Sequence, residues 1–276
     1  MKTPTCGVDD VADPDSLCHN TAMAQRIAFF DLDKTLIDVN SAKLWVRSEF
    51  RRGHIKWWMA LSAMFWTVMY GLGWTRMERL LIQGIRWLNG RDVDVIVART
   101  EAFYVDEVRH RFRPGALEAL RAHREAGDIL ALCTSSSSIL SHYVAHELDI
   151  PHILANGFEH NAGVFTGKPD PQQLCYGKGK LTHASALAER LGVHLDDCAF
   201  YTDSVSDLAL LEHVGEPVCV HPDRRLRRIA DNRGWQVSDW GVSGEPLALP
   251  APDALDDAKE KAGNGDKSWT GVLERS

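Results

Sequence analysis

Residues 27–36 read Ile27-Ala-Phe-Phe-Asp-Leu-Asp-Lys-Thr-Leu36, an apolar run that ends at two carboxylates. A strand buried in a parallel sheet is typically a continuous apolar run, so the pattern predicts a strand that ends before Asp31. In open α/β sheets the chemistry takes place just beyond the carboxyl ends of the strands. Asp31 and Asp33 lie at that edge and are candidates for phosphoryl transfer. The alternative is that they close a turn or cap a helix.

A second apolar run, residues 198–202, also ends at a carboxylate, Asp203, and Asp207 follows four positions later. Mg²⁺ is typically bound by one or two carboxylates together with waters and a substrate phosphate. Asp31 and Asp203 could supply that pair of ligands. Carboxylates at i and i+4 are also favoured at a helix start, which is the alternative interpretation of Asp203 and Asp207.

Two further segments complete a phosphate-binding pattern between these runs. Residues 129–135 form an apolar strand pattern that ends in the hydroxyls of Thr134 and Ser135. Residues 177–181, Gly-Lys-Gly-Lys-Leu, are a glycine-rich turn that opens an apparent helix, with Lys178 and Lys180 as candidate cations. Hydroxyl donors and a cation are the groups that a bound phosphate requires. The alternative for the serines that follow Thr134 is a helix N-cap.

In order and spacing, the four segments resemble the four motifs of the haloacid dehalogenase-like phosphatases. Residues 201–208, Tyr-Thr-Asp-Ser-Val-Ser-Asp-Leu, and residues 220–226, Val-His-Pro-Asp-Arg-Arg-Leu, resemble subfamily IB, the phosphoserine-phosphatase-like hydrolases. The likeness covers roughly residues 25 to 240. It implies an α/β fold, with a Rossmann-like parallel sheet core flanked by helices and an all-helical cap inserted after the first strand. It also implies a Mg²⁺-dependent phosphomonoesterase that hydrolyses a small-molecule phosphate through an aspartyl-phosphate.

The resemblance implies a role for each candidate residue. Asp31 would be the nucleophile and Asp33 the general acid and base, with a pKa nearer neutrality than that of a free Asp. The resemblance also implies phosphate and metal contacts. Thr134 and the Ser135 backbone N–H would bind phosphate, and Lys180 would neutralise its charge in preference to Lys178. Mg²⁺ would be held by the Asp31 carboxylate, the Asp33 carbonyl and Asp203. Asp207 would hold a metal-bound water or orient Lys180.

Two positions depart from the family pattern. Lys34 stands where the superfamily commonly has Gly, so the turn either tolerates a side chain or directs an extra cation outward, and we interpret Lys34 as an exposed turn lysine. Asn40 and Ser41 lie where phosphoserine phosphatases carry a Glu for the substrate amine. Specificity for phosphoserine is therefore not expected.

Length and composition favour one enzyme unit. The chain has 276 residues with 45% hydrophobic content, enough for one α/β domain and an insertion. A net charge of −7 argues against nucleic-acid binding, for which a basic surface is expected. Arg224, Arg225, Arg227 and Arg228 predict the solvated face of a helix, with an anion or partner site as the alternative. The six cysteines lack Cys-x-x-Cys spacing, which predicts reduced thiols in a cytoplasmic protein.

The chain divides into four parts by composition. Residues 1–22 are predicted to be a disordered leader, with Met23 as a plausible true start. Residues 23–38 and 112–240 are predicted to form the catalytic core, and residues 39–111 the helical cap, with helical periodicity around 40–52, 55–72, 75–88 and 92–110. Residues 241–276, rich in Gly, Pro, Ala and charge, are predicted to be a flexible tail. Such a cap would close over the site and select the leaving group.

The cap contains an unusual apolar run. Residues 57–74 are 18 positions without a charge, and six of the nine tryptophans fall between Trp45 and Trp87. A membrane-spanning helix needs about 20 apolar residues, and a span here would separate the cap from its core. Burial of this run in the cap or in the interface of a homodimer is the first interpretation. The protein is accordingly expected to be either a monomer or a homodimer. A peripheral membrane contact is the second, and it would make an amphiphilic or lipid-like phosphate the substrate.

Two functions of other classes remain open from the sequence. One is a non-catalytic phosphate-binding or phospho-acceptor protein similar to a response-regulator receiver, which also uses a strand-end Asp and Mg²⁺. Receivers lack the insertion after the first strand and the second carboxylate, Asp33. The other is a membrane-surface interaction protein that keeps the core only as a scaffold. The presence of Asp31, Asp33, Lys180 and Asp203 argues against this second function.

Overall fold

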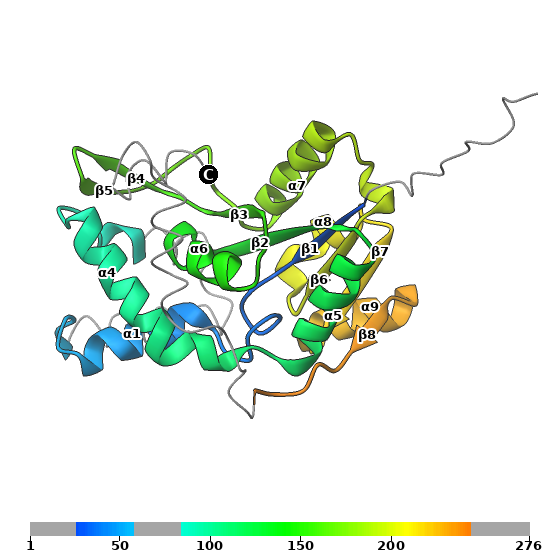
Figure 1. The fold of residues 1–276 in the computed structure, drawn as a ribbon, viewed down its shortest axis with the longest axis horizontal. Coiled ribbons are helices and arrows are strands. Elements are labelled where there is room, and N and C mark those ends of the chain that lie inside the picture. Colours follow the sequence, from blue (N-terminus) through cyan, green and yellow to red (C-terminus); the bar gives the residue numbers. More distant parts are fainter. Residues whose placement is uncertain (1–25, 58–83, 244–276) are drawn as a thin grey trace, which may run out of the picture.

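The computed structural model describes residues 26–57 and 84–243. Within these ranges a six-stranded sheet has the order β3-β2-β1-β6-β7-β8, and every pair of neighbouring strands is parallel (Figure 1). The strands are β1 (Ile27–Phe30), β2 (Ile129–Ser137), β3 (His152–Asn156), β6 (Ala199–Thr202), β7 (Glu216–Val220) and β8 (Gln236–Ser238). The predicted parallel α/β core is therefore confirmed.

The central strand β1 is apolar throughout because helices cover both faces of the sheet. Side chains alternate between the faces of a strand. Ile27 and Phe29 belong to one buried cluster, and Ala28 and Phe30 belong to the other. Helices α5 (Pro114–Glu125) and α6 (Ser138–Glu147) contribute to the cluster around Phe30. Helices α7 (Lys178–Leu191), α8 (Leu208–Leu211) and α9 (Arg224–Arg233) contribute to the other cluster.

The register of the sheet determines which residues meet at its carboxyl edge. Phe30, the last residue of β1, is paired with Leu132 of β2 and with Tyr201 of β6. Asp31 therefore follows at the level of Cys133 and Thr202, and β2 continues beyond this level to Ser137. The backbone N–H of Asp31 donates to the Tyr201 carbonyl at 2.9 Å, which holds the start of the loop against β6.

Two helices of the insertion after β1 lie in the described ranges, α1 (Ser41–Arg51) and α4 (Val93–Phe103). A π-helical turn, Tyr104–Val108, and a 3₁₀ turn, Arg109–Arg111, continue α4 toward the core. Ion pairs join these segments: Glu49 of α1 pairs with Arg99 of α4 at 3.3 Å, and Arg52, just after α1, pairs with Asp106 of the π-helical turn at 2.8 Å. The helices predicted around 55–72 and 75–88 lie almost entirely outside the described residues.

A β-hairpin that the sequence analysis did not predict lies beside the cap helices (Figure 1). Its strands are β4 (Phe158–Asn161) and β5 (Val164–Pro169), which form a separate antiparallel sheet. Phe165 exchanges backbone hydrogen bonds with the segment before α4, accepting from Gly90 and donating to Arg91, each at 2.9 Å. A segment within the predicted core range therefore belongs structurally to the surroundings of the cap.

The end of the described chain is attached to the core. The Trp240 ring lies 5.3 Å from the Tyr201 ring, and the Ser243 hydroxyl donates to the Asp38 carboxylate at 2.7 Å. Residues 241–243, which fall within the predicted tail, are thus bound to the loop that follows β1.

The described helices include none with the length and apolar character that crossing a membrane requires. Of the apolar run at residues 57–74, only Trp57 is described, and 66% of its surface is exposed.

Gly215, just before β7, provides a test of this packing. A Cβ at this position would lie 1.7 Å from the carbonyl oxygen of Asp196, so the backbone would have to move. We expect Gly215→Ala to lower the free energy of unfolding by roughly 1–3 kcal/mol, measured by urea denaturation. Gly84→Ala is the matched control, because no atom lies within 4 Å of the added carbon. An equal loss of stability in both variants would contradict the packing described for Gly215.

Candidate active site

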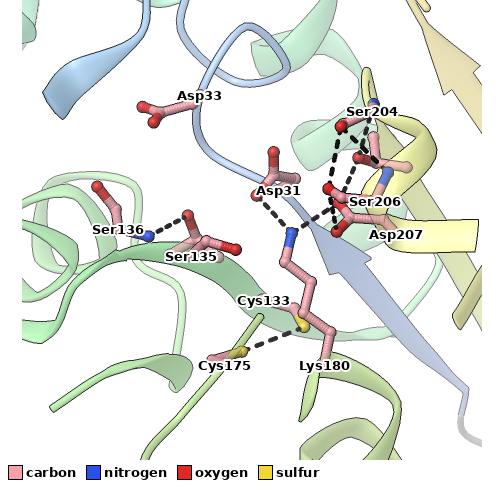
Figure 2. A network of polar contacts seen from close by, with 12 residues as sticks. Asp31, Asp33, Cys133, Ser135, Ser136, Cys175, Lys180, Ser204, Ser206 and Asp207 are labelled. Carbon is pink, nitrogen blue, oxygen red and sulfur yellow. Dashed lines mark hydrogen bonds and ion pairs between the residues drawn. The ribbon is translucent and has the colours of Figure 1, made fainter. Parts of the chain in front are cut away.

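The predicted site residues gather where β1, β2 and β6 end, and Figure 2 shows most of them in one network. The loop after β1 supplies Asp31 and Asp33, the end of β2 supplies Thr134 and Ser135, α7 supplies Lys180, and the loop after β6 supplies Asp203 and Asp207. These segments are distant in sequence. The parallel sheet brings their ends together.

Lys180 is the centre of the network. Its side chain is 1% exposed, and its ammonium donates to Asp31 Oδ1 at 2.8 Å and to Asp207 Oδ2 at 2.7 Å. Burial lowers the pKa of Lys180, but the Asp207 and Asp31 carboxylates outweigh burial and hold the pKa well above its ordinary value. Lys180 is therefore charged at neutral pH. Lys178, the alternative cation, is exposed and has no comparable contact in the described structure.

Asp31 is buried at the end of β1 with its carboxylate toward Lys180 (Figure 2). Burial raises the pKa of Asp31 to about 7; Lys180 opposes this shift, and the Asp207 carboxylate adds to it. Only the Oδ1 oxygen accepts a side-chain hydrogen bond from the described residues. The other oxygen is therefore available to a phosphorus atom or a cation.

Asp207 is held by three side-chain donors. Its Oδ2 accepts from the Thr202 hydroxyl at 2.6 Å and from Lys180, and its Oδ1 accepts from the Ser206 hydroxyl at 3.3 Å. Of the two roles predicted for Asp207, this geometry favours the orientation of Lys180 over direct contact with a metal-bound water.

Asp203 is nearly buried at the start of the loop after β6. Burial raises the pKa of Asp203 to about 7, and repulsion from Asp31 adds to the shift. The Asp203 carbonyl accepts from the backbone N–H of Asp223 at 2.8 Å. Asp223 Oδ2 also accepts from the Val205 N–H at 3.0 Å, so Asp223 supports the loop on both sides of Ser204.

Sequence reasoning assigned no role to Asp223. Its other oxygen caps α9 by accepting from the N–H groups of Arg225 and Leu226 at 2.8 and 2.9 Å. The signal was present, since an Asp that directly precedes a helical pattern is a typical N-cap. Its contact with the Asp203 loop could not be read from the sequence.

The hydroxyl segment at the end of β2 is fixed by a second residue that the sequence analysis missed. The Asn156 side chain donates to the Ser135 carbonyl at 2.6 Å and accepts from the Cys175 N–H at 2.8 Å. Thr134 is buried, with its hydroxyl accepting from the Ser136 N–H at 3.1 Å. The Ser137 hydroxyl caps α6, which is the alternative left open for these serines.

Asp33 is turned away from Asp31 and toward the cap (Figure 2). Its carboxylate accepts from the Ser41 N–H at 2.8 Å and from the Asn40 side chain at 3.3 Å. Burial raises the pKa of Asp33, while the hydrogen bonds from Ser41 oppose the shift. The start of α1 thus holds the predicted acid, and the Ser41 hydroxyl also contacts the Ser136 hydroxyl at 2.8 Å.

The donor set at the strand ends fits Mg²⁺. In the described ranges no three His, Cys, Asp or Glu side chains form a group that could hold a metal ion. Mg²⁺, however, commonly uses one or two carboxylates and completes its shell with other oxygens. Asp31 and Asp203 are buried carboxylates whose mutual repulsion a divalent cation would relieve. These two residues would hold the ion, with the Asp33 carbonyl as a further candidate.

Lys34 is exposed in a turn, as predicted. Its side chain is 54% exposed, but its ammonium lies 3.7 Å from Asp203 Oδ2. The lysine is therefore directed toward the carboxylates of the site rather than away from them.

The contacts of Asp223 lead to a test. Asp223→Ala removes the acceptors for Val205 and for the first turn of α9, so we expect a loss of about 1–2 kcal/mol in the free energy of unfolding. Because the Asp203 loop is then less well held, calorimetry should also show weaker Mg²⁺ binding. Asp223→Asn separates the two contacts: its one amide oxygen can still cap α9 and retain most of the stability, but its NH2 group cannot accept from Val205, so Mg²⁺ binding should still be weaker than in wild type. Unchanged Mg²⁺ affinity in a folded Asp223→Ala protein would limit Asp223 to helix capping.

Comparison with known proteins agrees with this geometry. Residues 28–212 match the haloacid dehalogenase-like hydrolase family. A phosphoserine phosphatase of Mycobacterium tuberculosis is 29% identical over 232 residues, covering 83% of this chain and 75% of that protein. A probable phosphatase of the same organism is 30% identical over 238 residues, covering 84% and 81%.

The fold also matches a solved structure. A protein of unknown function from Bordetella pertussis superposes with a TM-score of 0.72 at 29% identity, covering 79% of this chain and 100% of the other. The family match covers two thirds of the chain, its relatives include phosphatases, and the carboxylate–lysine network lies at the edge of the sheet. The chain therefore belongs to the haloacid dehalogenase-like hydrolases and is a phosphoric monoester hydrolase.

Proposed function

We propose that this protein is a Mg²⁺-dependent phosphomonoesterase that hydrolyses a small-molecule phosphate through an aspartyl-phosphate on Asp31. The observation that carries the proposal is the buried Lys180, which bridges Asp31 and Asp207 beside the hydroxyl segment of β2. A buried charged network of this kind is weak evidence for stability, because desolvation offsets much of the attraction. Its position at the strand ends supports a functional role.

The residues divide the reaction between them. An oxygen of Asp31 attacks phosphorus and forms the covalent intermediate, which water then hydrolyses. Lys180 lowers the repulsion between the Asp31 carboxylate and the incoming phosphate, and Thr134 with the Ser135 N–H contacts the phosphate oxygens. When bound, Mg²⁺ would supply further positive charge beside Asp31 and Asp203.

Asp33 supplies the proton for the leaving oxygen and later takes one from the attacking water. Its raised pKa suits this exchange, because the carboxyl can hold a proton nearer neutral pH than a free Asp. Ser41 and Asn40, which hold Asp33, belong to the start of the cap helix α1. The position of the cap and the direction of the acid are therefore coupled.

The cysteines support a cytoplasmic location for this enzyme. Cys133, Cys175, Cys198 and Cys219 are buried and free. Disulfides are rare in reducing compartments, where buried thiols behave as small apolar side chains.

Asp31→Asn tests the covalent mechanism. Loss of the nucleophilic oxygen should lower kcat by about 10³-fold or more, with the fold intact. Since linked catalytic groups act as a unit, Asp31→Asn/Asp33→Asn should be hardly worse than Asp31→Asn alone. The exposed Asp197→Asn is a matched control that should retain wild-type turnover of p-nitrophenyl phosphate. Substantial phosphatase activity in purified Asp31→Asn would end the covalent proposal.

The choice of leaving group can be tested with a substrate panel. Positions 40 and 41 carry an amide and a hydroxyl, which lack the charge needed to pair an ammonium, and a buried unpaired charge is costly. We therefore expect L-phosphoserine to have a lower kcat/KM than phosphomonoesters of uncharged or amphiphilic alcohols, such as glycerol phosphate and a short alkyl phosphate. If phosphoserine exceeded every other substrate tenfold, another residue would have to supply the carboxylate.

A further inference from the structure

Lys34 occupies a backbone conformation that does not suit a lysine. Its φ is 59°, in the left-handed region where a side chain is disfavoured and glycine is not. The conformation is held from both sides: the Lys34 N–H donates to the Val39 carbonyl at 3.0 Å, and the Lys34 carbonyl accepts from Arg113 Nε at 3.2 Å. Arg113 is itself buried. Strained residues that the surroundings enforce occur preferentially at functional sites.

The Lys34 side chain starts from this fixed position and reaches the mouth of the site. Its ammonium is 3.7 Å from Asp203 Oδ2, and its charge opposes the rise in the pKa values of Asp203 and Asp33. An ion pair that is half exposed contributes little to stability, so this contact does not explain why the strain is kept. A function in the site would explain it.

The two lysines of the site differ in what they can bind. Lys180 is buried beneath the carboxylates, and both of its described hydrogen bonds are to Asp31 and Asp207. Lys34 has the single ion pair with Asp203, and its exposed side chain can move. A divalent cation on Asp203 would repel the Lys34 ammonium and leave it beside the position of the incoming phosphate.

We infer that Lys34 is a substrate-binding residue, whose ammonium pairs with Asp203 in the metal-free protein and with the phosphate group of the phosphomonoester in the loaded site. This inference rests on the proposed function. It makes Lys34 the solvent-side counterpart of Lys180, so that the phosphate dianion lies between two ammonium groups. Lys34 makes its contact with Asp203 from this left-handed backbone conformation.

Three substitutions separate charge from conformation. Lys34→Gly and Lys34→Asn remove the ammonium and suit a positive φ, so neither should unfold the protein. Lys34→Arg keeps the charge. Lys168→Asn on β5 removes an exposed lysine and is the matched control.

The binding of inorganic phosphate at saturating Mg²⁺, and of Mg²⁺ alone, would be measured by calorimetry on the full chain. We expect Lys34→Gly and Lys34→Asn to weaken phosphate binding about tenfold, the size of one charge-assisted hydrogen bond. Mg²⁺ alone should bind these two variants as tightly as wild type or more tightly, because a competing cation is gone. Lys34→Arg and Lys168→Asn should bind phosphate within about twofold of wild type, which is a small change on the same scale.

Equal phosphate affinity in wild type, Lys34→Gly and Lys34→Asn would overturn the inference while leaving the phosphatase proposal in place. Loss of phosphate binding in Lys34→Arg as severe as in Lys34→Gly would also overturn it, because charge would not be the cause. A wild-type protein that neither binds phosphate with Mg²⁺ nor hydrolyses a phosphomonoester would reject the proposed function, and the inference with it.

Discussion

The ion pairs of the buried Lys180 are the constraint on which the rest of the site depends. Lys180 and Asp31 are 149 residues apart in the chain, yet their charged atoms are 2.8 Å apart. A lone buried charge is expensive, so the buried lysine requires a carboxylate partner at this position. This condition requires the start of α7 to lie under the end of β1, next to the loop after β6. The parallel order β2-β1-β6 satisfies it.

A second set of polar residues holds the loops around this network. Asn156 joins the end of β2 to the segment before α7, and Asp223 joins the Asp203 loop to the start of α9. Both residues bind backbone groups. They therefore fix the path of the chain rather than the direction of one side chain, and the functional groups inherit their positions from that path.

The cap is connected to the chemistry through the loop after β1. This loop carries Asp31 and the strained Lys34 and leads directly into α1. The start of α1 in turn holds the Asp33 carboxylate. The Ser41–Ser136 contact joins the same helix to the hydroxyl segment at the end of β2. A shift of α1 would consequently change both the direction of the Asp33 carboxylate and the surroundings of that segment.

The sequence by itself determined the strands β1, β2, β6 and β7 and the residues at their ends, because a continuous apolar run followed by polar residues is a local pattern. It also identified the arginine-rich helix α9, in which Arg224, Arg225, Arg227 and Arg228 are exposed. Several features were decided only by tertiary structure: the burial of Lys180 between Asp31 and Asp207, the turn of Asp33 toward α1, the supports from Asn156 and Asp223, the direction of Lys34 and the hairpin beside the cap. Each depends on contacts between segments that are far apart in the chain or on the direction of a side chain in a turn. Local periodicity carries no information about either, because it is the packing of the whole sheet and cap that sets them.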